Sequence, residues 1–264
     1  MTQITQGFIL AAGRGKRMQH LTDDKPKPLV KVAGKCLIDY NVEHLMNLGI
    51  KDCVVNLCYK GDMIRQHLLE TYPQMNFIFS NEEEALETGG GIQNALPLMR
   101  DEPFFVINSD ALWSDAGNEN LLKEMAQSWN DEKQDIMLMM QPVDKAFGCH
   151  ANGDYLLDEN LSPQRRRDAG INAPYLYGGV MICHPRVFSN EEKGRYSLVR
   201  IFDRLEKQQR LSSYIHKGQW FHVGDPNATE IAEKHFSKQK SQQSKTAGLL
   251  DLIELKKQLS SPRF

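Results

Sequence analysis

The chain has 264 residues, of which 41% are hydrophobic and 25% are charged, and its formal net charge is −2. This balance is typical of a folded protein in water and argues against the disordered and membrane-spanning classes. Its 32 basic and 34 acidic residues create no overall positive field that would hold a nucleic-acid backbone. We therefore expect neither a nucleic-acid partner nor a membrane partner.

The cysteine count indicates a reducing compartment. The number is odd, and the spacing contains no CxxC pair and no metal-ligand pattern, so we expect free thiols. The polar N-terminal residues 1–6 do not resemble a signal peptide, and we expect a cytoplasmic location. The five cysteines are Cys36, Cys53, Cys58, Cys149 and Cys183.

The first half of the chain alternates short apolar runs with helical patterns. Strands are predicted at 8–12, 53–57, 77–79 and 104–107, and helices at 37–48, 62–69 and 90–98. Such alternation predicts an α/β fold of Rossmann-like type, with a mixed, mainly parallel sheet flanked by helices. Asn108, Ser109 and Asp110 follow the last of these strands, at the edge where open α/β sheets bind ligands.

The second half gives weaker signals. Helices are predicted at 120–129, 198–208 and 227–236, and strands at 136–140, 177–183 and 220–223, with irregular polar sequence from 143 to 174. We predict one domain over residues 1–240. The leucine-rich stretch 249–259 predicts an amphipathic helix within a C-terminal helical extension of residues 241–264.

A glycine-spaced basic loop follows the first strand. Gly13 and Gly15 let bare backbone approach a phosphate, while Arg14, Lys16 and Arg17 add positive charge. An ordinary strand-to-helix turn also uses such glycines, and that alternative stays open. The loop matches neither the Walker ending nor the GxGxxG dinucleotide fingerprint.

Lys27 lies between two prolines shortly after this loop. Pro26 and Pro28 fix the neighbouring backbone in an extended form and limit where the ammonium group can point. A preorganised cation suits a phosphoryl group, whereas the alternative is a solvated surface lysine.

Together, the segment Leu10-Ala11-Ala12-Gly13-x-Gly15-x-Arg17-Met18 and the segment Pro26-Lys27-Pro28-Leu29 resemble the signature of the sugar-1-phosphate nucleotidyltransferases. The likeness continues at 86–92 (LETGGGI) and 108–110 (NSD), and more weakly at 177–180 and 220–224, so it covers about residues 7–235. The short chain and the LETGGGI segment are most similar to the bacterial N-acetylmuramate alpha-1-phosphate uridylyltransferases of cell-wall recycling.

The resemblance implies an NTP, with UTP favoured, a sugar 1-phosphate acceptor, Mg²⁺ and a monomer or homodimer. It also implies a nucleotide-binding half of about 1–115 and a sugar-binding half of about 116–240 that carries a small acceptor-side lobe. Arg17 and Lys27 would neutralise phosphate charge as catalytic groups. The other residues implied to bind the nucleotide are Leu10, Ala11, Ala12, Gly13, Arg14, Gly15, Thr88, Gly89 and Asn108.

Candidate metal ligands lie in two parts of the chain. Asp110 is the expected magnesium ligand and catalytic residue, with a helix cap as the alternative. The family's second metal-binding Asp falls at His222 here. Asp225 is favoured as the replacement because imidazole is a poor ligand for Mg²⁺, although His222 stays an alternative and Asp225 before Pro226 equally suits a helix cap.

The acceptor side has the weakest signals, because the family's Glu-Lys-Pro segment is absent from 141–175. Gly153, Asp154 and Gly179 are assigned to the sugar, and Glu87 is either a sugar contact or a first-turn carboxylate. The arginine run 165–167 falls in the sugar-facing region but is more typical of a solvated surface. Rival functions are cytidylyl or guanylyl transfer to phosphocholine or mannose 1-phosphate, and nucleotide binding by a regulator without turnover.

Overall fold

The computed structural model describes residues 3–149, 152–168 and 170–241. Within these ranges, no helix has the length and apolar character that crossing a membrane requires. The predicted helix at 249–259 lies outside the described residues.

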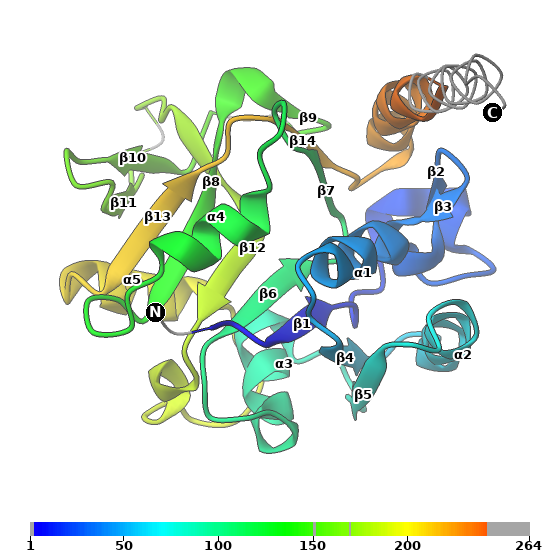
Figure 1. The fold of residues 1–264 in the computed structure, drawn as a ribbon, viewed down its shortest axis with the longest axis horizontal. Helices are drawn as coiled ribbons and strands as arrows, with labels where there is room; N and C mark the ends of the chain where they lie inside the picture. The colour runs from blue at the N-terminus through cyan, green and yellow to red at the C-terminus, as the bar shows by residue number, and fades with distance from the viewer. Residues whose placement is uncertain (1–2, 150–151, 169, 242–264) are drawn as a thin grey trace, which may run out of the picture.

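Four parallel strands form the N-terminal half of the main sheet, in the order β5-β4-β1-β6 (Figure 1). Their side chains are mostly buried on both faces, as expected for parallel strands that helices cover. The strands are β1 (Gln6–Leu10), β4 (Asp52–Leu57), β5 (Asn76–Asn81) and β6 (Phe104–Asn108). The connecting helices are α1 (Leu37–Asn47), α2 (Gly61–Thr71) and α3 (Glu87–Ala95).

Antiparallel pairing extends the same sheet in the C-terminal half. The long strand β12 pairs antiparallel with both β6 and β8, and β13 then lies parallel to β8. A hairpin of β10 and β11 adds to the start of β12 and forms a small lobe. These strands are β8 (Ile136–Pro142), β10 (Tyr155–Leu157), β11 (Pro163–Arg165), β12 (Tyr175–Cys183) and β13 (Leu211–Ile215). The predicted mixed α/β sheet flanked by helices is confirmed.

Two smaller sheets lie beside the main sheet. In one, β14 (Gln219–His222) lies between β7 (Ala111–Ser114) and β9 (Ala146–Phe147), and in the other β2 (Lys31–Val32) pairs with β3 (Lys35–Cys36). Two further α-helices are α4 (Leu121–Ser128) and α5 (Val199–Lys207). Short 3₁₀ segments occur at Lys16–Thr22, Lys27–Leu29, Leu96–Leu98, Val143–Lys145 and Pro185–Phe188.

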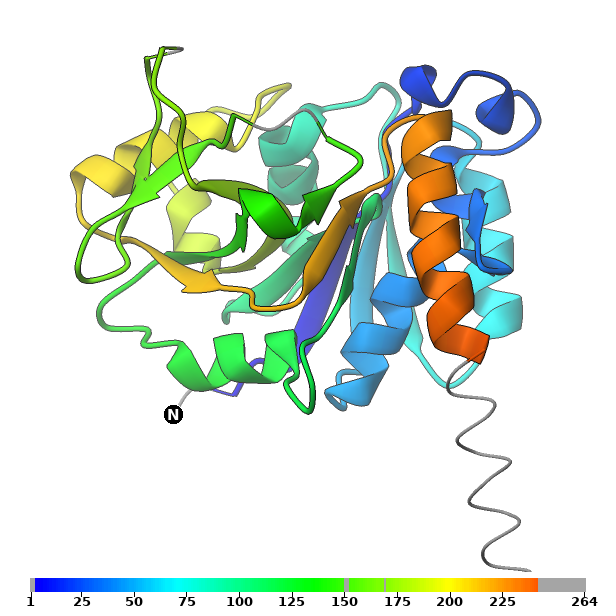
Figure 2. The ribbon, with the colours of Figure 1, turned by 90° about the horizontal axis from the view of Figure 1, so that it is seen from above.

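A helix over residues 226–241 crosses back to the N-terminal half and lies beside α1 and β2 (Figure 2). Glu233 of this helix accepts a hydrogen bond from the backbone N–H of Ala33, and the rings of Phe236 and Tyr40 lie 5.0 Å apart. The helix near the C-terminal end of the described chain therefore packs on the N-terminal half.

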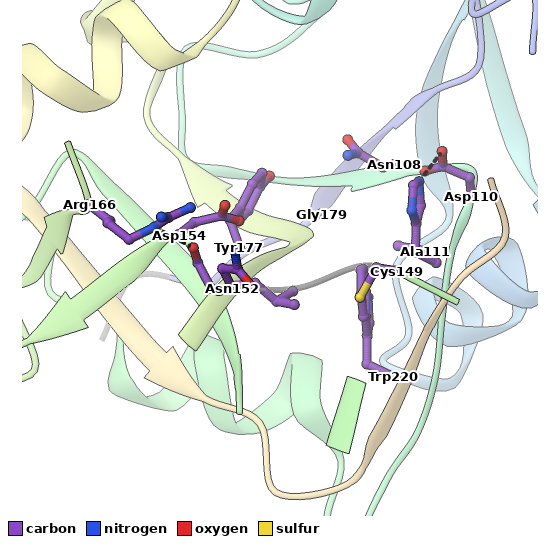
Figure 3. Close-up of a pocket in the computed structure, with 13 residues that line it drawn as sticks. Asn108, Asp110, Ala111, Cys149, Asn152, Asp154, Arg166, Tyr177, Gly179 and Trp220 are labelled. Carbon is purple, nitrogen blue, oxygen red and sulfur yellow. Dashed lines mark hydrogen bonds and ion pairs between the residues drawn. The ribbon is translucent and has the colours of Figure 1, made fainter. Parts of the chain in front are cut away.

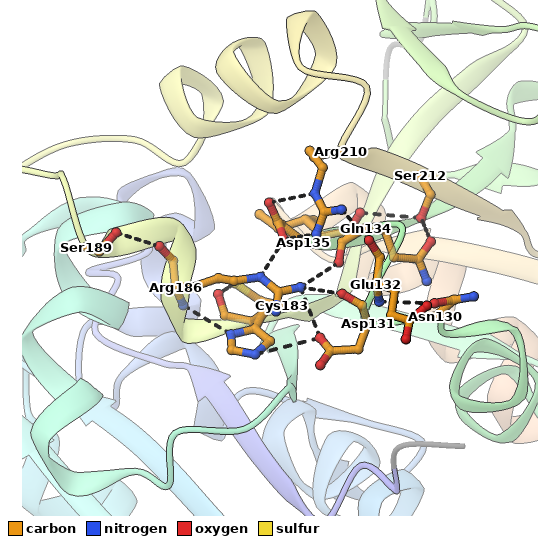
Figure 4. A network of polar contacts seen from close by, with 12 residues as sticks. Asn130, Asp131, Glu132, Gln134, Asp135, Cys183, Arg186, Ser189, Arg210 and Ser212 are labelled. Carbon is orange, nitrogen blue, oxygen red and sulfur yellow. Dashed lines mark hydrogen bonds and ion pairs between the residues drawn. The ribbon is translucent and has the colours of Figure 1, made fainter.

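A cluster of charged residues ties the C-terminal strands together (Figure 4). Asp135, just before β8, accepts hydrogen bonds at 2.6 Å from both Arg186 after β12 and Arg210 before β13. Burial raises the pKa of Asp135, but the two guanidinium groups more than offset this and hold it below its usual range. Three strand ends are thereby fixed to one carboxylate.

Three local expectations need correction. The helix predicted at 90–98 begins at Glu87, so its glycines lie inside the helix, and it ends at Ala95 before a 3₁₀ turn. The strands β7 and β13 were not predicted. The polar stretch 143–174 is not irregular throughout, because it contains β9, β10 and β11.

Candidate active site

Two cavities meet at the carboxyl end of β6. The N-terminal cavity, about 390 Å³, is lined by the glycine loop, Lys27 and the start of α3. The C-terminal cavity, about 350 Å³, is lined by the small lobe, β12 and β14 (Figure 3). Asn108 and Asp110 line both cavities. A group held in one cavity can therefore meet a group held in the other at these two residues.

An ion pair lies at this junction. Lys27 Nζ donates a hydrogen bond to Asp110 Oδ2 at 2.6 Å, and His222 Nε2 lies 3.3 Å from the same oxygen. Only 10% of the Lys27 side chain and 24% of the Asp110 side chain are exposed. Burial alone raises the pKa of Asp110, but Lys27 and His222 more than offset it and bring the pKa well below its usual range. Asp110 is therefore ionised at neutral pH.

The glycine loop packs directly against Lys27. Gly15 has a φ of +68°, which disfavours a side chain, and a Cβ placed there would lie 2.7 Å from the Cβ of Lys27. Glycine at this position lets the loop and the lysine close onto one cavity. Both features that the sequence singled out are thus brought together, and the structure excludes the solvated-surface alternative for Lys27, which is 8% exposed.

A buried hydrogen-bond chain joins the glycine loop to the start of α3. Asn56 Oδ1 accepts from Ala11 N at 2.7 Å, and Asn56 Nδ2 donates to Glu82 Oε1 at 2.7 Å. Glu82 Oε2 in turn accepts from Leu86 N at 2.9 Å. A Cβ on Gly91 would lie 2.8 Å from both Asn56 Nδ2 and Glu82 Oε1, so this glycine makes room for the chain.

Asn56 and Glu82 were missed in the sequence analysis, although both line the N-terminal cavity. They end or directly follow two neighbouring parallel strands, β4 and β5. A polar residue in that position was the available signal, because the carboxyl ends of parallel strands share one edge of the sheet.

The start of α3 is fixed by residues 196–198. Gly89 N donates to the carbonyl of Tyr196 at 2.9 Å, and Thr88 Oγ1 accepts from Leu198 N at 3.0 Å. Thr88 lines the N-terminal cavity, whereas Gly89 lies buried behind it. Glu87 also lines the N-terminal cavity, where it is a first-turn carboxylate of α3 and pairs with Arg195 at 3.1 Å. The other residues assigned to the sugar line the C-terminal cavity.

The other predicted nucleotide ligands divide into two groups. Ala11 is buried, and its N–H is bonded to Asn56. Arg14 lies 5.2 Å above the Tyr59 ring, in a hollow beside the N-terminal cavity. The residues that line the N-terminal cavity as expected are Leu10, Ala12, Gly13, Gly15, Arg17, Lys27 and Asn108.

The C-terminal cavity gathers Gly153, Asp154 and Gly179, as the sequence predicted. It also gathers Trp220, whose Nε1 donates to the Gly178 carbonyl at 2.8 Å, where the β12–β8 register shifts. Arg166 of the arginine run points into this cavity, while its two neighbours do not (Figure 3).

The two alternatives for the second metal ligand lie in different places. Asp225 Oδ1 accepts from Ala228 N at 2.9 Å and caps the helix 226–241, and the residue lines neither cavity. His222 lies beside Asp110 instead. A divalent ion fits this donor set, since Mg²⁺ is usually held by one or two carboxylates together with substrate phosphates and water.

Comparison with known proteins agrees with this arrangement. The family described as Nucleotidyl transferase matches residues 6–239. The chain belongs to this family. It is 38% identical over 230 residues to the N-acetylmuramate alpha-1-phosphate uridylyltransferase of Caulobacter vibrioides, covering 86% of this chain and 94% of that protein. It is 33% identical over 224 residues to the enzyme of the same name from Neisseria meningitidis serogroup B, covering 83% and 93%.

More distant relatives and solved structures extend the picture. The Arabidopsis thaliana mannose-1-phosphate guanylyltransferase 1 is 28% identical, covering 84% of this chain and 62% of that protein. The inositol-1-phosphate CTP transferase structure from T. maritima has a TM-score of 0.74 at 19% identity, covering 90% of this chain and 97% of that chain, and shares the fold. The protein is therefore a sugar-1-phosphate nucleotidyltransferase, and its family generally uses a divalent metal.

Proposed function

We propose that this nucleotidyltransferase transfers UMP from UTP to N-acetylmuramate 1-phosphate and releases pyrophosphate. The supporting observation is the identity of 38% to a uridylyltransferase of that name, along 94% of its length. The mannose-1-phosphate guanylyltransferases are less similar, and the chain spans only about three fifths of their length.

In this proposal, UTP occupies the N-terminal cavity. The backbone of Gly13 and Gly15 approaches the phosphates without steric obstruction, and Arg17 and Lys27 neutralise their charge. The base lies beside Thr88, which lines the N-terminal cavity at the start of α3. The Asn56–Glu82 link holds these two walls at a fixed separation.

Asp110 and His222 would hold Mg²⁺, with Asp110 as the main ligand because its carboxylate oxygen suits a hard ion. The ion would supply charge neutralisation on the phosphate oxygens. Lys27 contributes a fixed positive charge at the same point, and its hydrogen bond to Asp110 sets its direction.

The sugar phosphate needs no general base, since it is already ionised at neutral pH. An oxygen of the 1-phosphate attacks the α-phosphorus, and the bond to the pyrophosphate oxygen breaks as the new phosphorus–oxygen bond forms. The protein contributes by placing the two reactants in line at Asn108 and Asp110 and by stabilising the charge on pyrophosphate.

Guanylyl transfer to mannose 1-phosphate is the second candidate, because relatives of that activity match 84% of the chain. Pyrophosphate release decides between them, with five NTPs tested against the 1-phosphates of N-acetylmuramate, N-acetylglucosamine, glucose and mannose. We expect the largest kcat/KM with UTP and N-acetylmuramate 1-phosphate. A preference for GTP with mannose 1-phosphate would establish the second candidate, and binding without turnover would indicate a regulator.

We also infer one domain over residues 1–240, with a nucleotide-binding half of about 1–115 and a sugar-binding half of about 116–240. A single cooperative unfolding transition would support it, and two resolved transitions would contradict it. Light scattering distinguishes the expected monomer from the homodimer, and cell fractionation tests the expected cytoplasmic location.

A further inference from the structure

Cys36, Asp39 and His67 form a compact cluster outside the two cavities. They come from three elements, β3, α1 and α2, and they line neither cavity. The thiol sulfur, a carboxylate oxygen and an imidazole nitrogen all lie within 4.8 Å of one another. Cys36 and Asp39 are buried, whereas 25% of the His67 side chain is exposed. No metal-ligand spacing marks these residues in the sequence, because His67 belongs to a separate helix.

Asp39 lies at the centre of this cluster. Its Oδ2 accepts a hydrogen bond from Cys36 N at 2.9 Å, and its Oδ1 lies 2.6 Å from His67 Nε2. The side chain of Cys36 in turn accepts from the backbone N–H of Asp39. One carboxylate oxygen is thus fixed by the backbone while the other faces the imidazole, which is how protein groups commonly orient a carboxylate that binds a metal.

A cysteine, a histidine and an aspartate also occur together around cysteine nucleophiles. A nucleophile needs the imidazole beside the thiol and a lowered thiol pKa. Here His67 Nε2 bonds to Asp39 instead, and burial together with the Asp39 carboxylate raises the pKa of the Cys36 thiol to about 11. The thiol is therefore protonated at neutral pH when no metal is bound, and the geometry does not suit nucleophilic chemistry.

The same three groups suit a divalent ion. Thiolate, imidazole and carboxylate are the common ligands of Zn²⁺, and the ligand atoms of a tetrahedral site lie about 3.5 Å apart. The cluster needs only small movements to reach that spacing. Binding would release the Cys36 thiol proton to water, and His67 would bind through Nε2 with its own proton on Nδ1. The thiolate and the carboxylate together would balance the charge of the ion.

We propose that Cys36, Asp39 and His67 bind a zinc-type divalent ion, at a structural site separate from the proposed Mg²⁺ site. Water would take the fourth position on the partly exposed His67 side. The site does not depend on which NTP or which acceptor the enzyme uses.

The cluster is connected to the segment that carries Lys27. Leu37 N donates to the carbonyl of Val30 at 2.9 Å, and Cys36 pairs with Lys31 in the β2–β3 hairpin. A metal bound to Cys36 would therefore stabilise the local fold that supports Lys27, without touching either reactant.

Co²⁺ tests the site in the full-length protein, with Mg²⁺ in excess. A thiolate ligand gives bound Co²⁺ a strong sulfur-to-metal absorption in the near ultraviolet, which oxygen and nitrogen ligands do not give. We expect one Co²⁺ per chain with this absorption, and we expect Zn²⁺ to displace it. Cys36→Ser should abolish the absorption. His67→Gln should weaken Co²⁺ binding by at least about tenfold, since even the loss of an outer partner of a metal ligand has an effect of that size.

Cys149→Ser and Cys58→Ser are the matched controls. Cys149 lines the C-terminal cavity near the proposed Mg²⁺ site, and Cys58 is a partly exposed thiol that lines neither cavity. Both variants should keep the absorption. Cys36→Ser retains a hydrogen-bond acceptor at the start of α1, so it should fold without the metal, and circular dichroism checks this.

Thermal unfolding gives a second measurement. At a Zn²⁺ concentration of about 100 times Kd, the Tm of the native protein should rise by about 5 °C, and the Tm of Cys36→Ser by less than half as much.

Three results would overturn the inference: no thiolate absorption in the native protein, its persistence in Cys36→Ser, or its loss in Cys149→Ser. The first would leave the cluster as a hydrogen-bonded helix cap, and the last would place the Co²⁺ in the C-terminal cavity. Pyrophosphate release tests the proposed function separately, so either proposal can fail without the other.

Discussion

The two cavities are built in different ways. The N-terminal cavity takes most of its walls from segments at or after the carboxyl ends of parallel strands, and its lining includes the glycine loop residues Gly13 and Gly15. The C-terminal cavity takes its lining from segments near 150, 166, 178 and 221, which antiparallel pairing and the β7–β14–β9 sheet bring together. The residues that line the N-terminal cavity belong to local sequence motifs. The residues that line the C-terminal cavity come together only through tertiary pairing of the strands.

This difference matches the chemistry that each cavity serves in the proposed function. A triphosphate is common to all reactions of this type, and backbone donors bind it with little dependence on side chains. The acceptor differs from one enzyme to another, so its contacts are side chains such as Asp154 and Arg166 on a small lobe. Substitutions should therefore have general effects at the junction and the N-terminal cavity, and acceptor-specific effects in the C-terminal cavity.

The largest effect is expected at the junction of the cavities. Lys27→Ala and Asp110→Asn should each lower kcat by at least about 100-fold with every acceptor, because each removes a charge that the transferring phosphates require. Steady-state pyrophosphate release measures this effect, and circular dichroism checks that the fold is retained.

Lys35→Ala is the control for this prediction. Lys35 also forms a lysine–carboxylate pair, with Glu43, but both side chains are more than a third exposed and lie outside the two cavities. Its turnover should be close to that of the native enzyme. Near-normal turnover of Lys27→Ala would show that the glycine loop alone neutralises the phosphates.

The next largest effect is expected from the buried link between the walls of the N-terminal cavity. Glu82→Gln replaces one of two accepting oxygens with an NH₂ group, so the bond to Asn56 or to Leu86 N is lost. We expect the KM for the NTP to rise by about tenfold, consistent with the loss of one buried charge-assisted hydrogen bond, while the KM for the acceptor stays unchanged. Glu83→Gln, at an exposed neighbour, is the control. Equal changes in both KM values would show that the link supports the whole fold.

The different construction of the two cavities explains how much of the site could be predicted from the sequence. Gly15 and Lys27 were found because glycine and proline mark backbone of special geometry, although Lys27 begins a 3₁₀ turn and does not have the extended form expected before Pro28. Asp110 was found because the end of a buried strand marks a ligand-binding edge. The inward turn of Arg166 depends on the β10–β11 hairpin and on contacts of its neighbour Arg165 with α5, which lies far away along the chain. The helix cap at Asp225 was foreseen, but only the structure shows that His222, and not Asp225, lines the C-terminal cavity.

His222 offers a smaller test, at the boundary between the cavities. His222→Asp places a second carboxylate beside Asp110, and we expect it to lower the half-saturating Mg²⁺ concentration by about three- to tenfold, since a hard ion prefers oxygen ligands. The preference for Mn²⁺ over Mg²⁺ should fall at the same time. Titration of Mn²⁺ by electron paramagnetic resonance measures binding apart from turnover. Unchanged affinity for both ions would place His222 outside the metal site, and Asp225→Asn, at the helix cap, is the control.

The smallest expected effect concerns a stacked ring contact between α1 and β7. His44 of α1 stacks on Trp113 of β7, with ring centroids 3.9 Å apart and planes at 12°. Burial lowers the pKa of His44 to about 4, while Asp115 raises it and His216 lowers it. The neutral ring is therefore favoured in the folded protein at neutral pH.

The sign of the resulting pH dependence follows from proton binding. The unfolded chain binds a proton at His44 near pH 6.5 and the folded chain only near pH 4, so stability falls as the pH is lowered between these values. His44→Phe keeps a stacked ring without this titration, and the free energy of unfolding should fall by about 1–2 kcal/mol less over that range than in the native protein. Urea unfolding at several pH values measures it, with His20→Gln, at an exposed position, as the control. If the free energy of unfolding depends on pH in the same way in the native and His44→Phe proteins, this ring contact is already solvated. If the pH dependence is flatter in His44→Phe and unfolding remains a single transition, this ring contact opens only on global unfolding.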